Sequence, residues 1–113
     1  MANNLLGVTL QSDPHNLKSR LEWGQPGFTI VDVRDRFTYN HGHITGAIPI
    51  PLKDLAQKAS SLVKNRDTYV YGESDEQSAQ AVQTLRDAGF ANVVELTGGL
   101  SAWKAIGGAV EGA

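Results

Sequence analysis

The chain has 113 residues, of which 41% are hydrophobic and 19% are charged, and its formal net charge is −2. This length is enough to bury roughly 65% of the unfolded surface around one core and too short for two such cores, so we expect a single domain over residues 1–113. The nearly balanced charge excludes a basic surface for nucleic acid and a polybasic patch for an anionic membrane.

All apolar stretches are far shorter than the roughly 20 residues that span a bilayer. The start of the chain, Met1–Asn4, lacks the basic segment and apolar core of a secretory signal. We therefore expect a cytoplasmic protein that has no membrane partner. The modest charge and the lack of a sustained heptad pattern favour a monomer.

Short apolar runs alternate with longer segments of helical period, a pattern typical of strands and crossover helices in a parallel sheet. Pro14 is expected at the first position of the first helix, after an Asp13 cap. The run 47–50 is predicted at a sheet edge because Pro49 cannot donate to a ladder. We predict an α/β three-layer fold, with a parallel sheet of about five strands and helices on both faces. The predicted strands are 7–11, 28–33, 47–50, 69–71 and 93–96, and helical spacing continues through Leu52, Leu55, Ala59, Leu62 and Val63.

A six-residue loop separates the predicted strand 69–71 from the helix that begins near Ser78. A strand that ends in a short loop before a helix aims backbone N–H groups and the positive end of the helix dipole at one point, where an anion can bind. Catalysis at that point requires a thiolate or an equivalent nucleophile, and the chain contains no cysteine. The residues of this loop are Gly72, Glu73, Ser74, Asp75, Glu76 and Gln77.

Ser74 and Gln77 have the spacing of a capping box, in which the serine hydroxyl accepts from the N3 amide and the glutamine side chain returns to the N–H of the cap residue. Asp75 and Glu76 then fall in the first helical turn, where the dipole favours negative side chains by about 0.3–1 kcal/mol each. These carboxylates therefore have two explanations. They either stabilise the start of the helix or form part of a binding site. Ser74 itself lacks the adjacent base that would make it a nucleophile.

Four segments, in this order, resemble the rhodanese-like domain family, and the similarity extends from near residue 10 to near residue 110. The segments are 30–34 (IVDVR), 42–51 (GHITGAIPIP), 70–90 and 97–103 (TGGLSAW). The resemblance implies the three-layer fold. It also implies that active members have a cysteine at the position of Gly72. That cysteine carries a persulfide, and backbone amides of the loop hold the sulfur or a bound oxyanion.

The chain departs from the family pattern in the loop. Gly72 stands at the cysteine position, and Gln77 stands where many active members have an arginine before the serine. The carboxylates of Glu73, Asp75 and Glu76 lie in this anion-binding loop. Each costs a bound anion about 1 kcal/mol at roughly 4 Å even in bulk water. Loss of a covalent nucleophile removes on the order of 10⁶-fold in turnover. Ordinary sulfur transfer is therefore excluded as a main activity, and no catalytic residue is assigned.

Asp32 and Arg34 match the Asp-x-Arg of the family and are predicted at the carboxyl end of a central strand, where ligands gather in open α/β sheets. They either contact a ligand or pair with each other and order the loop. His41 and His43 invite a metal site, but residues i and i+2 face opposite ways on an extended chain, so we predict no metal and no cofactor. The resemblance implies a structural role for His43.

Aromatic side chains divide into a predicted core group and a predicted surface group. Trp103 is expected to pack in the core, and Trp23 is expected to close the first helix against Phe28. Phe37 and Tyr39 are the candidate anchors for a partner, since exposed aromatic residues contribute disproportionately to interfaces.

The leading functional hypothesis is a catalytically inactive rhodanese-like domain that acts as a binding or regulatory module. A protein partner or a small ligand is expected at the loop Gly72–Gln77 and at its rim of Asp32, Arg34 and Phe37. The alternative is a sulfurtransferase-type enzyme that works with a cysteine from a partner protein, in which this domain orients the sulfur carrier.

Overall fold

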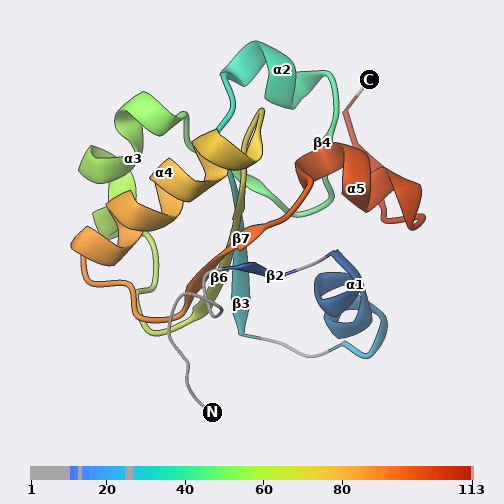
Figure 1. Ribbon diagram of the computed structural model, residues 1–113, viewed down its shortest axis with the longest axis horizontal. Coiled ribbons are helices and arrows are strands. Elements are labelled where there is room, and N and C mark those ends of the chain that lie inside the picture. Colours follow the sequence, from blue (N-terminus) through green and yellow to red (C-terminus); the bar gives the residue numbers. More distant parts are fainter. Residues whose placement is uncertain (1–10, 13, 25–26, 113) are drawn as a thin grey trace.

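The structure is a computed structural model that describes residues 11–12, 14–24 and 27–112. Its centre is one sheet of five strands in the order β2-β7-β6-β3-β5, in which every pair is parallel (Figure 1). The central strands β3 and β6 pair from Phe28 opposite Asp67 to Asp32 opposite Tyr71. The bounds are β2 (Gln11–Ser12), β3 (Phe28–Asp32), β5 (Ile48–Pro49), β6 (Asp67–Tyr71) and β7 (Val93–Leu96).

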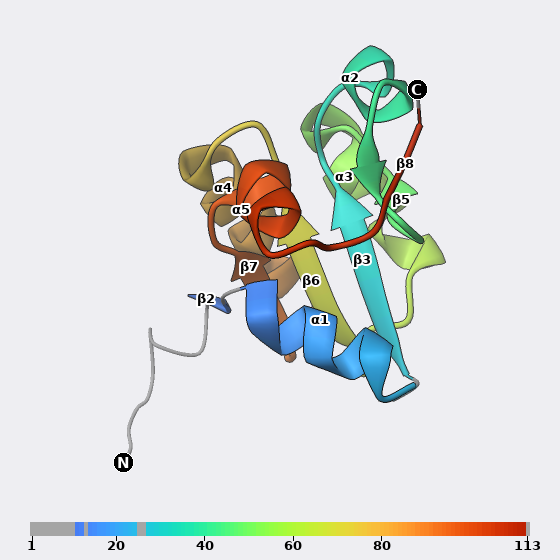
Figure 2. The same ribbon diagram turned by 90° about the vertical axis from the view of Figure 1, so that its right-hand side faces the viewer.

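Helices cover both faces of this sheet, which confirms the predicted three-layer α/β fold. In Figures 1 and 2, α3 and α4 lie on one face and α1 and α5 on the other. Successive residues of β6 point to opposite faces, so Val70 packs in the cluster with α3 and α4, whereas Tyr69 and Tyr71 pack in the cluster with α1 and α5. The bounds are α1 (Pro14–Glu22), α2 (Arg36–Asn40), α3 (Leu52–Lys58), α4 (Asp75–Asp87) and α5 (Gly99–Ala105).

Local sequence explains where α4 begins and ends. Ser74 is the N-cap, and its hydroxyl accepts from the Gln77 amide at 3.1 Å. At the other end Gly89 has a φ of +99°, and the Phe90 amide donates back to the Leu85 carbonyl at 3.0 Å. The first turn of α4 is therefore fixed at the carboxyl edge of the sheet, directly after β6.

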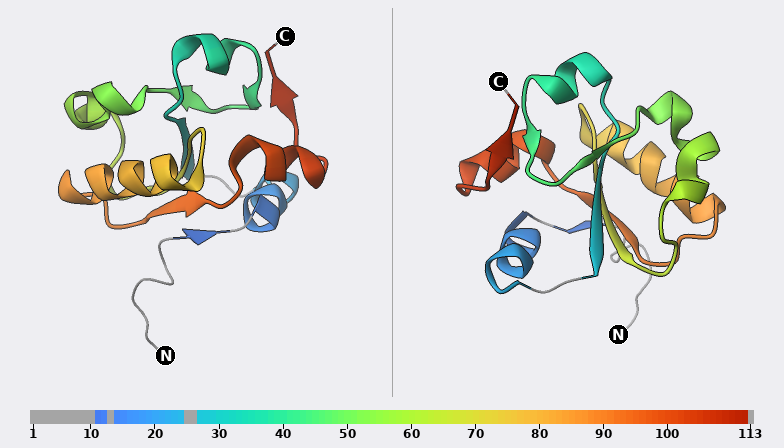
Figure 3. Two further views of the ribbon diagram at one scale, coloured as in Figure 1. Left: turned by 45° about the horizontal axis from the view of Figure 1, so that its top comes forward. Right: turned by 180° about the vertical axis from the view of Figure 1, so that it is seen from behind.

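A second, two-stranded sheet lies at the same end of the molecule. It pairs β4 (His43–Ile44) with β8 (Val110–Glu111) in antiparallel fashion, and Figure 3 shows β8 running beside β4. The indole of Trp103, which is 1% exposed, donates to the Ala109 carbonyl at 2.8 Å. The prediction that Trp103 is a core residue is confirmed, and this residue also holds the chain that leads into β8.

Several element predictions are confirmed where the structure describes them. Strand 93–96 has the predicted bounds, Pro14 is the first residue of α1, and Pro49 lies in the edge strand β5. The predicted strand 7–11, apart from Gln11, and the predicted cap at Asp13 lie outside the described residues.

Two predictions of local structure are wrong. The helical spacing through Val63 does not give one helix, because α3 ends at Lys58 and a 3₁₀ turn (Ala59–Ser61) follows, in which the Ser61 hydroxyl donates to the Lys58 carbonyl at 2.8 Å. Trp23 does not close α1, since 79% of it is exposed. Phe28 packs edge-on against Tyr69 instead, with ring centroids 6.0 Å apart.

The described part of the chain contains no helix that is long and apolar enough to cross a membrane.

Candidate functional site

The loop that follows β6 is shorter than the sequence indicated. Residues 72–74 form the connection, whereas Asp75, Glu76 and Gln77 are already the first turn of α4. A cleft of about 340 Å³ opens at this carboxyl edge of the sheet. The first turns of α4 and α5 lie side by side there (Figures 1 and 2). The cleft is lined by Arg34, residues 72–75 and residues 98–101.

Gly72 is required by space rather than by backbone conformation, because it is not among the glycines with positive φ. A Cβ atom placed on Gly72 would lie 2.4 Å from Oε1 of Gln77 and 3.1 Å from Cγ2 of Val33. The carboxamide of Gln77 therefore occupies the place where a side chain at position 72 would begin. The space beside Gly72 is therefore filled by a neighbouring side chain.

Side chains of α4 also accept hydrogen bonds from the first two backbone amides of the loop. The Gly72 amide donates to the Ser78 hydroxyl at 2.9 Å, and this hydroxyl donates to the Ser74 carbonyl at 3.1 Å. The Glu73 amide donates to Oε1 of Gln77 at 2.6 Å. Half of the predicted capping box is thus confirmed, whereas Gln77 reaches the residue before the cap instead of Ser74. These bonds leave fewer N–H groups for a ligand than the sequence pattern suggested.

Asp75 joins the two loops that border the cleft. Its Oδ1 accepts from the Gly98 amide at 2.9 Å. Gly98 and Gly99 have φ angles of +81° and +56°, and a Cβ on Gly99 would lie 3.2 Å from the Gly72 carbonyl oxygen. Asp75 is therefore a helix starter, as predicted, and also a tether between α4 and α5.

Arg34 is held by Asp32. The guanidinium donates from Nη2 to Oδ2 of Asp32 at 2.6 Å and to the Gly42 carbonyl at 2.6 Å, and from Nε to Oδ1 at 3.0 Å. Burial opposes the charge of Arg34, but the hydrogen bonds and the charge of Asp32, together with Tyr71 and Glu73, raise the pKa of Arg34. The interpretation as mutual pairing is confirmed, and Asp32, which is fully buried, does not line the cleft.

Tyr71, at the end of β6, connects this pair to the second sheet. Its hydroxyl accepts from the Ile44 amide at 3.0 Å. Burial, and then the charge of Asp32, raise the pKa of Tyr71 far above its ordinary value. The phenol therefore stays neutral and holds β4 against the main sheet.

The histidines make contacts with nearby backbone and rings. His43 is buried, its Nδ1 lies 2.7 Å from the Tyr39 carbonyl, and its ring stacks on Tyr39 at 3.7 Å. The Nδ1 of His41 lies 2.8 Å from the Phe37 carbonyl. In the described ranges no group of three or more His, Asp or Glu side chains is placed to hold a metal ion.

The two predicted aromatic anchors differ in exposure. Phe37 is 72% exposed, as an anchor requires. Tyr39 is partly buried, because its hydroxyl donates to the Ala47 carbonyl at 2.6 Å and its ring packs against the core cluster under α1 and α5. Tyr39 is therefore a packing residue, and its prediction as a surface anchor is wrong.

The structure brings together five of the eight residues that the sequence assigned to the site. Arg34 and residues 72–75 line the cleft, whereas Asp32, Glu76 and Gln77 do not. Sequence reasoning missed the second wall of the cleft, residues 98–101. Its signal was the pair Gly98-Gly99, whose positive φ angles allow the close approach of this wall to Gly72.

Residues 13–106 match the family model of the rhodanese-like domain. The chain belongs to this family, and it contains no cysteine, so the thiolate site of active members is absent.

The chain is similar to the Alr3790 protein from Anabaena sp., whose crystal structure is 66% identical, with a TM-score of 0.87, and covers 89% of this chain and 80% of that chain. The protein slr1261 from Synechocystis sp. is 36% identical over 83 residues, which are 74% of this chain and 46% of that protein. The thiosulfate sulfurtransferase GlpE from Shewanella oneidensis is 38% identical over 74 residues, 66% of this chain and 73% of GlpE. The chain thus spans about half the length of the Synechocystis relative.

Proposed function

We propose that this domain is catalytically inactive and serves as a binding or regulatory module, whose cleft takes a segment of a partner protein or a small ligand. The observation that carries the proposal is the Gln77 carboxamide, which would lie 2.4 Å from a Cβ at position 72 and accepts from the Glu73 amide. A site that awaited a cysteine would keep this place open. Here the place is filled and bonded, while a cleft of about 340 Å³ remains beside it.

Charge at the cleft supports a ligand other than a small oxyanion. The guanidinium of Arg34 is neutralised by Asp32 at 2.6 Å. Glu73 and Asp75 line the cleft as exposed carboxylates. Each would cost a nearby anion about 1 kcal/mol or more. A neutral or positively charged group, such as a peptide carbonyl beside a lysine, fits this arrangement better than sulfate or thiosulfate.

The alternative function is a sulfurtransferase-type reaction with a cysteine from a partner protein. It is supported by the position of Gly72, which itself lines the cleft, so a side chain that enters from outside comes close to Gly72, next to the space that Gln77 fills. This alternative requires that the occupant of the cleft present a reactive thiol.

The test is a titration of the ¹⁵N-labelled chain with cell extract and, separately, with thiosulfate, followed by the amide signals of residues 72–75 and 98–101. We expect the extract to shift these signals and thiosulfate to leave them unchanged. Ser101→Gln, which fills the cleft, is expected to abolish the effect, whereas Ser19→Gln, on an exposed face of α1, preserves it.

An extract that leaves the cleft signals unchanged, or an effect that survives in Ser101→Gln, would contradict the proposal. Blocking of the effect by alkylation of thiols in the extract would favour the alternative with a partner cysteine.

A further inference from the structure

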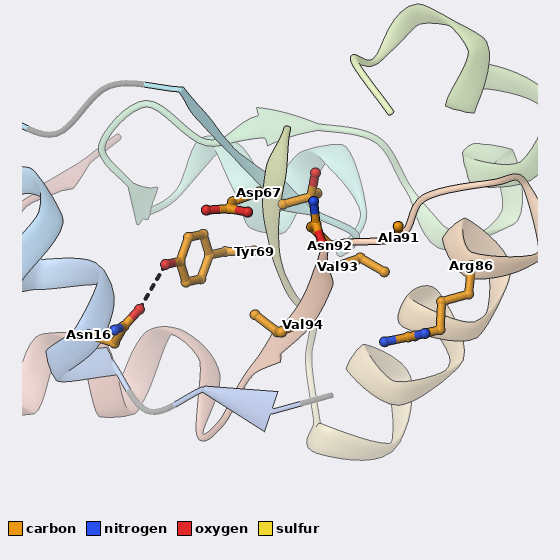
Figure 4. A pocket seen from close by; sticks show the side chains of 9 residues that line it. Asn16, Asp67, Tyr69, Arg86, Ala91, Asn92, Val93 and Val94 are labelled. Atoms are coloured by element: carbon orange, nitrogen blue, oxygen red, sulfur yellow. Dashed lines mark hydrogen bonds between the residues drawn. The ribbon is translucent and has the colours of Figure 1, made fainter. Parts of the chain in front are cut away.

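A second cavity lies at the end of the sheet opposite the cleft. Its volume is about 330 Å³, and it is formed by the first residues of β6 and β7, the last turn of α4 and the start of α1 (Figure 4). Cavities that bind small molecules start at about 300 Å³. Its walls are apolar at Val93 and Val94 and polar at Asn92 and Arg86. None of these residues belongs to the cleft beside Gly72.

Arg86 gives this cavity its charge. Its Nε is buried from solvent and has no hydrogen-bond partner among the residues that the structure describes. Figure 4 shows its guanidinium turned from α4 toward β7 and into the cavity. Arginine in the last turn of a helix is favoured by the helix dipole, which explains the residue type but supplies no acceptor for Nε. Buried N–H groups without an acceptor are rare, and each needs an explanation, such as a bound water, ion or ligand.

The carboxylate that lines the cavity already has an ion-pair partner. Asp67 accepts from Nη1 of Arg20 at 2.8 Å, so its carboxylate does not neutralise Arg86. The Tyr69 hydroxyl, on the same wall, donates to Oδ1 of Asn16 at 2.8 Å. With Asp67 paired in this way, the charge that faces the cavity is positive.

We propose that this cavity binds the oxyanion group, carboxylate or phosphate, of a small ligand. The two terminal nitrogens of the Arg86 guanidinium, Nη1 and Nη2, form a fork that matches two oxygens of such a group. The side-chain amide of Asn92 supplies a further donor, and Val93 and Val94 contact the apolar body of the ligand. The site is independent of the cleft, so the domain has one binding place at each end of its sheet.

The experiment titrates the ¹⁵N-labelled full chain with sodium acetate and, in a second arm, with inorganic phosphate. We expect saturable shifts of the Arg86 Nε–H and of the amides of Asn92 and Val93. Arg86→Gln is expected to weaken binding at least about tenfold. The matched control Arg66→Gln removes the same charge from an exposed residue outside the cavity and is expected to change binding less than about twofold.

Arg86→Lys keeps the charge and loses the fork, so intermediate binding is expected from it. Saturation by acetate alone assigns the site to carboxylates, and saturation by phosphate alone assigns it to phosphates. The proposal is overturned if neither anion saturates these signals, if Arg86→Gln and Arg66→Gln weaken binding equally, or if the shifts fall on Gly72–Ser78 instead.

Discussion

Gln77 and Gly72 depend on each other, although the sequence presents them as separate features of one loop. The glutamine carboxamide bonds the Glu73 amide and stands where a side chain at position 72 would start. A larger residue at 72 must therefore displace Gln77 and break its bond. Glycine at 72 and glutamine at 77 are thus two parts of one local arrangement.

A double-mutant cycle measures this dependence. Gly72→Ala is expected to lower the free energy of unfolding by about 1–2 kcal/mol, because the new methyl group displaces the carboxamide from the Glu73 amide. In a Gln77→Ala background the same substitution is expected to cost about half as much or less, since only the contact with Val33 remains. Urea unfolding of the four proteins gives the coupling. Equal costs in both backgrounds would show that the two residues are independent.

A cysteine introduced at position 72 would also meet the Gln77 carboxamide. Gly72→Cys alone is expected to form little persulfide from thiosulfate, because Gln77 crowds the new side chain and Glu73 and Asp75 repel the donor. Gly72→Cys with Gln77→Ala is expected to form at least about tenfold more, and Gly72→Ser with Gln77→Ala none. Persulfide is measured by mass spectrometry. Full persulfidation of the single variant would mean that only the sulfur atom was missing.

Tyr71 gives the domain an alkaline limit of stability. Because its pKa is higher in the folded chain than in the unfolded one, its contribution is complete below the unfolded value of about 10 and is lost as the pH rises above it. Tyr71→Phe is expected to flatten this loss. At neutral pH it is expected to cost about 1–3 kcal/mol, since the buried Ile44 amide loses its acceptor. Urea unfolding between about pH 8 and about pH 11 gives both quantities. A wild-type loss that persists unchanged in Tyr71→Phe would refute the assignment.

At the scale of elements, the cleft depends on how the starts of α4 and α5 are held together. The bond from the Gly98 amide to Asp75 crosses between them, and the pair Gly98-Gly99 allows the backbone of α5 to approach Gly72. The walls of the cleft are thus set by one carboxylate and two glycines. Of these three residues, only Asp75 was assigned to the site from the sequence.

Asp75→Ala is expected to destabilise the domain by about 1 kcal/mol and to speed hydrogen exchange of the Gly98 amide. Glu76→Ala removes the same charge from the same helical turn but no bond to α5, so exchange at Gly98 is expected to stay unchanged. If both variants speed this exchange equally, the effect comes from the helix dipole and not from the tether.

Over the whole molecule, the sequence predicted what depends on local pattern. The bounds of the strand 93–96 were predicted correctly because its apolar run is bounded by turn residues. The N-cap of α4 was predicted from Ser74. Contacts between distant segments were not predictable. The exposure of Trp23 and the burial of Tyr39 follow from tertiary packing, and Gln77 bonds one residue earlier than the capping-box pattern requires.

Two cavities of the described structure lie at opposite ends of its sheet and differ in charge. The cleft beside Gly72 carries carboxylates and an arginine that is already paired, whereas the opposite cavity carries Arg86, which has no ion pair among the described residues. The chain, whose relatives include a thiosulfate sulfurtransferase, contains no cysteine and has a cleft at the carboxyl edge of its sheet.

The most direct measurement of the central claim is sulfur transfer from thiosulfate to cyanide by the purified chain, with a cysteine-bearing sulfurtransferase in the same buffer as the positive control. We expect no thiocyanate above the protein-free blank, because nothing at position 72 can attack the donor. Turnover by the wild-type chain, retained after Ser74→Ala and free of contaminating enzyme, would contradict both the inactive site and the need for a partner's thiol.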